Sequence, residues 1–206
     1  MKLNLRARCL NYVLAALIAG ASAQAMAHHA FEDCADCHGK NGVSEHSDVP
    51  TIAGISAYTF EGYLQAYRDK TLPCEEAAYK AGDTSRAATD MCAIAENMTD
   101  QEITDMSERF AQLPFKPASQ PFDAAKAAAG EQIHLNSCEK CHTENGSYAD
   151  DDASILAGQW APYLTKVMNQ YRSGKRPYAE EKMKEKMDRL SDEDVKALAH
   201  FYASQQ

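Results

Sequence analysis

Two short stretches of this sequence place a pair of cysteines directly before a histidine. Cys34 and Cys37 precede His38, and the same spacing recurs over residues 138–142. Two thiols separated by two residues can each bond to one of the two vinyl groups of a porphyrin, and the adjoining histidine can then bind the iron. The sequence therefore predicts two covalently bound haem c groups, attached through Cys34, Cys37, Cys138 and Cys141, with His38 and His142 as iron ligands.

A cysteine pair of this spacing also occurs in zinc sites and in redox-active dithiols. A zinc site made from both pairs should bring them close together in the sequence or add further histidines near them. A thioredoxin-like dithiol should lie beside a βαβ pattern. The sequence shows neither context, so haem attachment is the favoured interpretation.

The first 27 residues have the features of a secretory signal peptide. Three basic residues precede an apolar run over residues 10–19, and small residues near Ala27 offer a cleavage site. A membrane anchor is the alternative, but this apolar run is shorter than the roughly 20 residues that span a bilayer. We therefore expect export to the periplasm, with no membrane span after cleavage.

Removal of residues 1–27 leaves 18 of the 21 basic residues and all 30 acidic ones, so the formal net charge is 18 − 30 = −12. A strongly acidic protein is a poor candidate for binding nucleic acid or anionic membranes. The charge suits docking on a basic patch of a protein partner, and it equally suits solubility alone. The composition does not choose between these two roles.

The second half of the chain repeats the first. With the CxxCH motifs aligned, residues 104 positions apart correspond, so that Ile52-Ala53-Gly54 matches Leu156-Ala157-Gly158. Near the end of each half the offset becomes 92, which leaves an insertion of 104 − 92 = 12 residues between about Lys70 and Met91. The repeat indicates tandem duplication of one domain.

Each half has the pattern of a helical domain. Apolar residues recur at helical spacing in 58–69 and 162–173, and Thr99 and Ser191 each begin a capping box for a last helix. We predict an all-α fold of two tandem class I cytochrome c domains, each a small helical fold around one haem. The expected boundaries are a signal peptide at 1–27, a first domain at 28–112, a proline-containing linker at 113–121 and a second domain at 122–206.

The repeat also selects a second axial ligand for each iron. Met91 and Met183 correspond to each other, each eight residues before the capping residue of the last helix, whereas the other methionines of the mature halves align with Leu or Ala. We predict that Met91 and Met183, presented from loops, complete the iron coordination. With both irons six-coordinate, no position remains for a substrate, and the expected chemistry is electron transfer.

Three further expectations concern the surroundings of the haems. Pro50 offers a carbonyl to the ring of the iron-binding histidine, and because Ser154 stands at the matching position of the second half, we expect this contact to differ between the two haems. Arg68 and Arg172 occur in register and either hydrogen-bond haem propionates or lie in solvent. Cys74 and Cys92 bracket the insertion, and in an oxidising compartment we expect them to form a disulfide bond, with free thiols or a redox-active pair as the alternatives.

Two CxxCH domains joined by a proline-containing linker resemble the diheme cytochromes c of bacterial periplasms. From residue 117 onward the chain is similar to the cytochrome subunit of flavocytochrome c sulfide dehydrogenase, and the specific part is the run Leu156-Ala157-Gly158-Gln159-Trp160 with the C-terminal residues 201–206. The haem-binding cysteines and histidines of that family map onto the residues named above, and its axial methionines map onto Met91 and Met183. The insertion that contains Cys74 and Cys92 departs from the family pattern.

This resemblance implies that the chain is not an enzyme by itself. Its role would be to accept electrons from the FAD of a separate flavoprotein subunit that oxidises sulfide, and to pass them to a soluble cytochrome c. The sequence has no GxGxxG motif, so a flavin would belong to the partner. The alternative function is a free-standing diheme shuttle that feeds a terminal oxidase.

Overall fold

The computed structural model describes residues 31–206. The predicted signal peptide, residues 1–27, lies outside this range. Within the described range the regular elements are helices, apart from one isolated antiparallel β-bridge between Ala77 and Thr89 in the insertion. None of the helices in residues 31–206 is both long enough and apolar enough to cross a membrane. The all-α prediction is confirmed.

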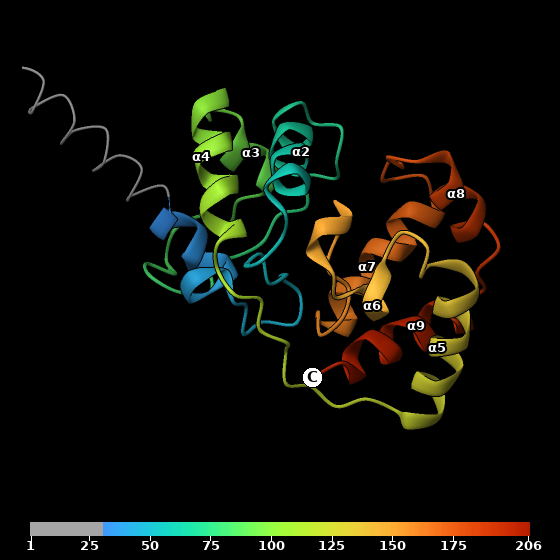
Figure 1. The fold of residues 1–206 in the computed structure, drawn as a ribbon. Helices are drawn as coiled ribbons and strands as arrows, with labels where there is room; N and C mark the ends of the chain where they lie inside the picture. The colour runs from blue at the N-terminus through green and yellow to red at the C-terminus, as the bar shows by residue number, and fades with distance from the viewer. Residues whose placement is uncertain (1–30) are drawn as a thin grey trace, which may run out of the picture.

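The first half consists of helical turns at residues 31–38, the 3₁₀ turn η1 (Lys40–Gly42), and the helices α2 (Ala57–Arg68), α3 (Met91–Ala95) and α4 (Asp100–Ala111) (Figure 1). Each of these three α-helices has an N-cap residue. The side chains of Ser56, Asp90 and Thr99 each accept a hydrogen bond from a backbone N–H of the first turn, which has no partner within the helix. The helices α2 and α4 pack together around a core of buried residues: Phe31, Ile52, Ile55, Phe60, Leu64, Ile103, Met106 and Phe110.

The second half repeats this plan with a longer first helix. Its elements are α5 (Ala124–Ser137), α6 (Thr143–Gly146), η2 (Ala149–Asp151), α7 (Ala161–Arg172), α8 (Glu181–Met187) and α9 (Asp192–Ser204) (Figure 1). The helices α5 and α9 pack against each other, and α7 packs on α9. The predicted helices at 58–69 and 162–173 are each displaced by one residue from the observed α2 and α7.

The close crossing of α5 and α9 depends on Gly130. A Cβ atom at this position would lie 2.2 Å from the carbonyl oxygen of Ala197 on α9, which is nearer than atoms can approach without a shift of the backbone. The sequence therefore uses glycine in mid-helix despite its low helix propensity. The close approach positions the end of α5, where the second CxxCH motif begins.

Matching residues form equivalent backbone hydrogen bonds within each half. In the first half the amides of Ile52 and Ala53 donate to Gly42 O, at 2.8 and 3.1 Å. In the second half the amides of Leu156 and Ala157 donate to Gly146 O at the same two distances. The alignment of the sequence repeat thus corresponds to an equivalent local structure in each half.

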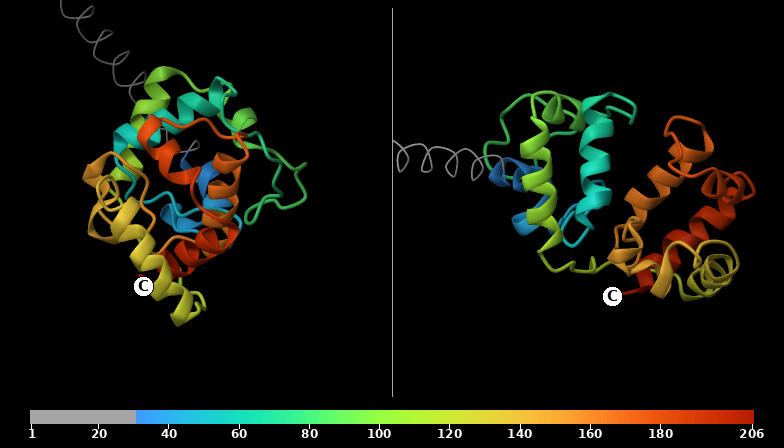
Figure 2. Two further views of the ribbon diagram at one scale, coloured as in Figure 1. Left: turned by 90° about the vertical axis from the view of Figure 1, so that its right-hand side faces the viewer. Right: turned by 45° about the horizontal axis from the view of Figure 1, so that its top comes forward.

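The segment between α4 and α5 runs along one side of the molecule and contacts the second half (Figure 2). The Ala118 amide donates to Gly158 O at 2.7 Å, and the Gln120 side chain bonds the backbone of Gln159 and Ala161 at 2.9 Å each. Three prolines prevent this segment from continuing α4 as a helix. The connection is therefore held in place by the domain that follows it.

Candidate haem sites

The first site contains a buried histidine whose orientation is fixed. The Nδ1 atom of His38 lies 2.9 Å from the carbonyl oxygen of Pro50. A carbonyl oxygen only accepts hydrogen bonds, so Nδ1 carries the proton and the lone pair of Nε2 is available to a metal. Burial also lowers the pKa of His38, which favours the neutral form that binds metals. This arrangement confirms the expected role of the Pro50 carbonyl and fits an iron ligand.

The second site has the same arrangement with a longer contact. The Nδ1 atom of His142 lies 3.3 Å from Ser154 O, and burial lowers the pKa of this histidine as well. Ser154 occupies the position that corresponds to Pro50. The expected difference between the two carbonyl contacts is therefore present, with the second contact 0.4 Å longer.

Three thiols of the CxxC pairs, those of Cys34, Cys37 and Cys138, lie in surroundings that disfavour their charged form. Burial raises the pKa of Cys34 to about 12 and also raises the pKa of Cys37 and Cys138. Redox-active dithiols depend on a lowered thiol pKa. The environment of these cysteines therefore does not match that of a dithiol oxidoreductase, and it is compatible with covalent attachment to an apolar group.

The two candidate methionine ligands occupy equivalent places. Met91 packs on the core of the first half, as Cys34 also does, and Met183 packs on the core of the second half, which includes Tyr202. Both methionines lie in short helices, α3 and α8, rather than in the loops that the sequence predicts. A helix of five residues, such as α3, is too short to show a hydrophobic period.

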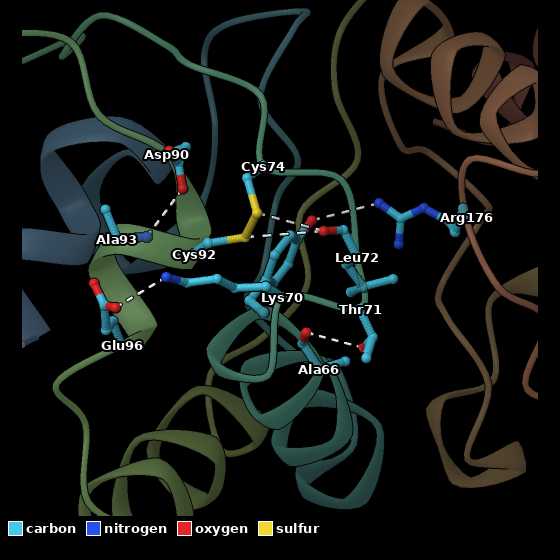
Figure 3. The surroundings of a disulfide bond; sticks show 11 residues. Ala66, Lys70, Thr71, Leu72, Cys74, Asp90, Cys92, Ala93, Glu96 and Arg176 are labelled. Carbon is cyan, nitrogen blue, oxygen red and sulfur yellow. Dashed lines mark hydrogen bonds and ion pairs between the residues drawn. A yellow bond between two sulfur atoms is a disulfide. The ribbon is translucent and has the colours of Figure 1, made fainter.

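The insertion is closed by a disulfide bond between Cys74 and Cys92, with the two Cα atoms 5.5 Å apart (Figure 3). Cys92 follows Met91 in α3 and is buried. The amides of Lys80 and Ala81 donate to Asp36 O at 2.8 and 2.9 Å, and Arg86 forms an ion pair with the Asp36 carboxylate. The insertion therefore covers the CxxC turn of the first half, a contact that the sequence alone does not reveal.

The arginines in register bind protein groups in this structure. Arg68 donates to Met98 O at 3.1 Å and forms an ion pair with Asp100 at 2.8 Å. Arg172 forms the equivalent ion pair with Asp192 at 2.7 Å. Each arginine thus contacts the first residue of the last helix in its own half. The two arginines therefore form equivalent ion pairs with exposed aspartates at the start of α4 and α9.

A polar interface between the halves was not apparent in the sequence. The Tyr63 hydroxyl lies 2.5 Å from Ser154 Oγ, and buried Arg176 donates to Tyr67 OH at 3.4 Å across the same interface. Figure 3 shows the Arg176 side chain extending from the second half toward the base of the insertion. Periodicity along one segment cannot predict these pairs, because they join residues about a hundred positions apart. The spacing of tyrosines on α2 was the one available signal.

Comparison with known proteins agrees with this geometry. Residues 24–108 match the family model described as cytochrome c, and residues 125–201 match the model described as cytochrome c oxidase, cbb3-type, subunit III. Cytochrome c-554(548) of Halomonas halodenitrificans is 36% identical over 84 residues, which cover 40% of this chain and 100% of that protein. These matches and the two His–carbonyl sites define a c-type cytochrome of two domains.

The chain belongs to the cytochrome c family, as a diheme member of the cytochrome c4-like group, and carries two covalently bound haem c groups. Cytochrome c4 of Stutzerimonas stutzeri is 25% identical over 93% of this chain and 98% of its own length. The thiosulfate dehydrogenase electron acceptor of S. stutzeri strain A1501 is 27% identical over 90% of this chain and 82% of its own length. The crystal structure of reduced cytochrome c4 from Pseudomonas stutzeri has the same fold, with a TM-score of 0.70, 23% identity, and coverage of 87% of this chain and 98% of that chain.

Proposed function

We propose that this chain is a periplasmic electron carrier whose two haem irons are each held by one histidine and one methionine. His38 and Met91 bind the first iron, and His142 and Met183 bind the second. The thioethers form at the CxxC cysteines: Cys34, Cys37, Cys138 and Cys141. The observation that carries the proposal is the matched pair of histidines, His38 buried and His142 partly buried, each with Nδ1 directed at a backbone carbonyl and Nε2 left for a metal.

When bound, a haem of this type exchanges one electron between its ferric and ferrous states. The surrounding protein holds the ligands and excludes substrates. The carbonyls of Pro50 and Ser154 fix the histidine rings, and the packed cores hold the methionine side chains in place. With one histidine and one methionine on each iron, the bound haems would offer no site to a small molecule, and the chain would transfer electrons without being an enzyme by itself.

The domain limits belong to the same proposal. The signal peptide occupies 1–27, the first cytochrome domain 28–112, the linker 113–121 and the second domain 122–206. In the described residues, the cores of the two halves consist of separate sets of side chains, which supports this division. Export through the signal peptide delivers the chain to the periplasm, where haem attachment and the Cys74–Cys92 disulfide are both compatible with the oxidising conditions.

The electron donor in this proposal is the FAD of a flavoprotein subunit that oxidises sulfide, and the acceptor is a soluble cytochrome c. The resemblance of residues 117–206 to the cytochrome subunit of sulfide dehydrogenase supports this assignment. A relative named as the electron acceptor of a thiosulfate dehydrogenase supports a donor that oxidises a sulfur compound, whether that compound is sulfide or thiosulfate. A free-standing shuttle to a terminal oxidase is the competing function.

Purification from the native periplasm under mild conditions tests this function, because a permanent subunit stays with its partner. We expect a second, larger chain and a flavin absorption band beside the haem bands. A second chain without flavin, with thiosulfate-dependent reduction of the haems, would assign the donor to a thiosulfate dehydrogenase and contradict the flavoprotein. Haem bands with no partner would support the independent shuttle.

A further inference from the structure

Gln159, in the second half, contacts the peptide group between Pro50 and Thr51, whose carbonyl orients His38 in the first half. Gln159 Oε1 accepts a hydrogen bond from the Thr51 backbone N–H at 3.0 Å, and Gln159 Nε2 donates to Thr51 O at 2.9 Å. The exposed fractions of Gln159 and Thr51 are 3% and 1%. The orientation of the Gln159 amide is unambiguous, because the reverse orientation would place donor against donor and acceptor against acceptor.

The Thr51 N–H and the Pro50 carbonyl belong to the same peptide group. A continuous chain of hydrogen bonds therefore runs from Gln159 Oε1 through this peptide to Nδ1 of His38. Successive hydrogen bonds polarise one another, so the bond at the N–H makes the carbonyl a stronger acceptor. The contact between Nδ1 of His38 and Pro50 O measures 2.9 Å, an ordinary hydrogen-bond length.

The second half lacks these residues at the matching positions. Ile55 corresponds to Gln159, and its apolar side chain cannot accept a hydrogen bond from the backbone N–H of Ile155, which corresponds to that of Thr51. The contact between His142 and Ser154 O is 3.3 Å. The sequence repeat thus provides an internal comparison, in which one histidine is supported by an amide side chain from the other half of the chain and the other histidine is not.

We infer that Gln159 is a positioning residue that lowers the reduction potential of the haem bound by His38, and so makes the two haems unequal. A stronger hydrogen bond from Nδ1 leaves more electron density on Nε2, which stabilises ferric over ferrous iron. Because Gln159 lies in the second half, correct docking of the two halves sets this potential. The inference rests on the proposed ligation of iron by His38.

The test uses the mature diheme protein with Gln159→Met, which removes the acceptor and the donor at similar side-chain volume. Spectroelectrochemical titration should show a raised midpoint potential for the haem of His38 and an unchanged potential for the haem of His142. Gln159→Glu keeps the acceptor, so it should not raise the potential of the His38 haem. The His38 haem is identified by NMR of protein labelled with ¹⁵N-histidine.

Trp160→Phe is the matched control. The Trp160 indole donates to Ser44 O at 3.0 Å, so this variant removes a neighbouring bond between the halves and leaves the Thr51 amide paired. Equal shifts in Gln159→Met and Trp160→Phe, equal shifts of both haems, or no shift at all would overturn the inference.

A measurement on the unmodified protein does not depend on whether the variants fold. In the reduced state, the Nδ1 proton of His38 should exchange with solvent more slowly and resonate further downfield than that of His142. Equivalent resonances would contradict the inference. Histidine spectra that show no iron ligation by His38 would instead contradict the proposed function, so the two failures are distinguishable.

Discussion

The hydroxyl of Tyr63 on α2 lies 2.5 Å from Ser154 Oγ, and the carbonyl of the same Ser154 accepts the hydrogen bond from His142. A residue of the first half therefore contacts the residue that orients the iron-binding histidine of the second half. Together with the pairing of Gln159 and Thr51, this contact connects each haem site to the opposite half of the chain.

Replacement of Tyr63 by Phe should loosen this connection. The variant loses one partly buried hydrogen bond, and we expect the free energy of unfolding to fall by about 1 kcal/mol, the usual net value of such a bond. Denaturant titration followed by circular dichroism measures the change. Tyr58→Phe on the same helix is the control, because 75% of Tyr58 is exposed, and it should be neutral. An equal loss in both variants would contradict the structural role of the Tyr63 contact.

The Cys74–Cys92 disulfide should stabilise the first half. It closes a loop with a sequence separation of 18, for which the chain-entropy model gives about 3 kcal/mol. The double variant Cys74→Ser with Cys92→Ser should therefore unfold at lower denaturant concentration in its first half. Amide hydrogen exchange in α9 of the second half, followed by NMR, serves as the internal reference. An unchanged transition in the first half would show that the crosslink contributes no stability.

Helix α4 should lose stability in acid through its capping box. The Glu102 carboxylate accepts from the amide and the hydroxyl of Thr99, both at 2.8 Å, and these bonds lower its pKa. Because the folded pKa lies below the unfolded one, the stabilisation is present at neutral pH and is lost as the pH falls through the folded pKa.

Thr99→Ala should accordingly cost about 1 kcal/mol at pH 7 and less at pH 3. Urea titrations at the two pH values measure this difference. Thr84→Ala in the exposed part of the insertion is the control and should have little effect at either pH. A cost for Thr99→Ala that is the same at both pH values would argue against a contribution from the Glu102 carboxylate.

Two glycines in mid-helix should respond to alanine in opposite ways. Gly130→Ala places a Cβ atom 2.2 Å from Ala197 O, and we expect a loss of about 1–3 kcal/mol, as for an overpacked core. Gly62→Ala on α2 meets no atom within 4 Å, and it should gain about 0.5–1 kcal/mol from helix propensity. Thermal or denaturant unfolding of the two variants checks the sign of each change, and a stable Gly130→Ala protein would contradict the close crossing of α5 and α9.

Much of the fold could be predicted because the relevant signals are local. The CxxCH motifs, the capping boxes at Thr99 and Ser191, and the helical period of residues 58–69 each depend on neighbours within a few positions. The duplication added a second copy of every signal, and it selected Met91 and Met183 from among the six methionines that follow the predicted signal peptide. The observed ends of α2 and α7 differ from the predicted ends by one residue.

The contacts between the halves could not be predicted in the same way. Thr51 and Gln159 are 108 positions apart, and their pairing depends on how the two domains dock. The contact of the insertion with Asp36 likewise requires the chain to fold back by about fifty residues. The period of a helix shows which face is buried, but it does not show which distant residue that face meets.

Axial ligation by Met91 and Met183 is the claim on which the electron-carrier function depends, and the near-infrared absorption of the ferric protein tests it most directly. Met-ligated ferric haem c has a weak band in this region. The unmodified protein should show the band, Met91→Leu and Met183→Leu should each remove about half of its intensity, and the double variant should lack it. Met98→Leu, which aligns with Leu190 in the other half, should leave the band intact. A band that persists in the double variant, or that is absent from the unmodified protein, would contradict the account.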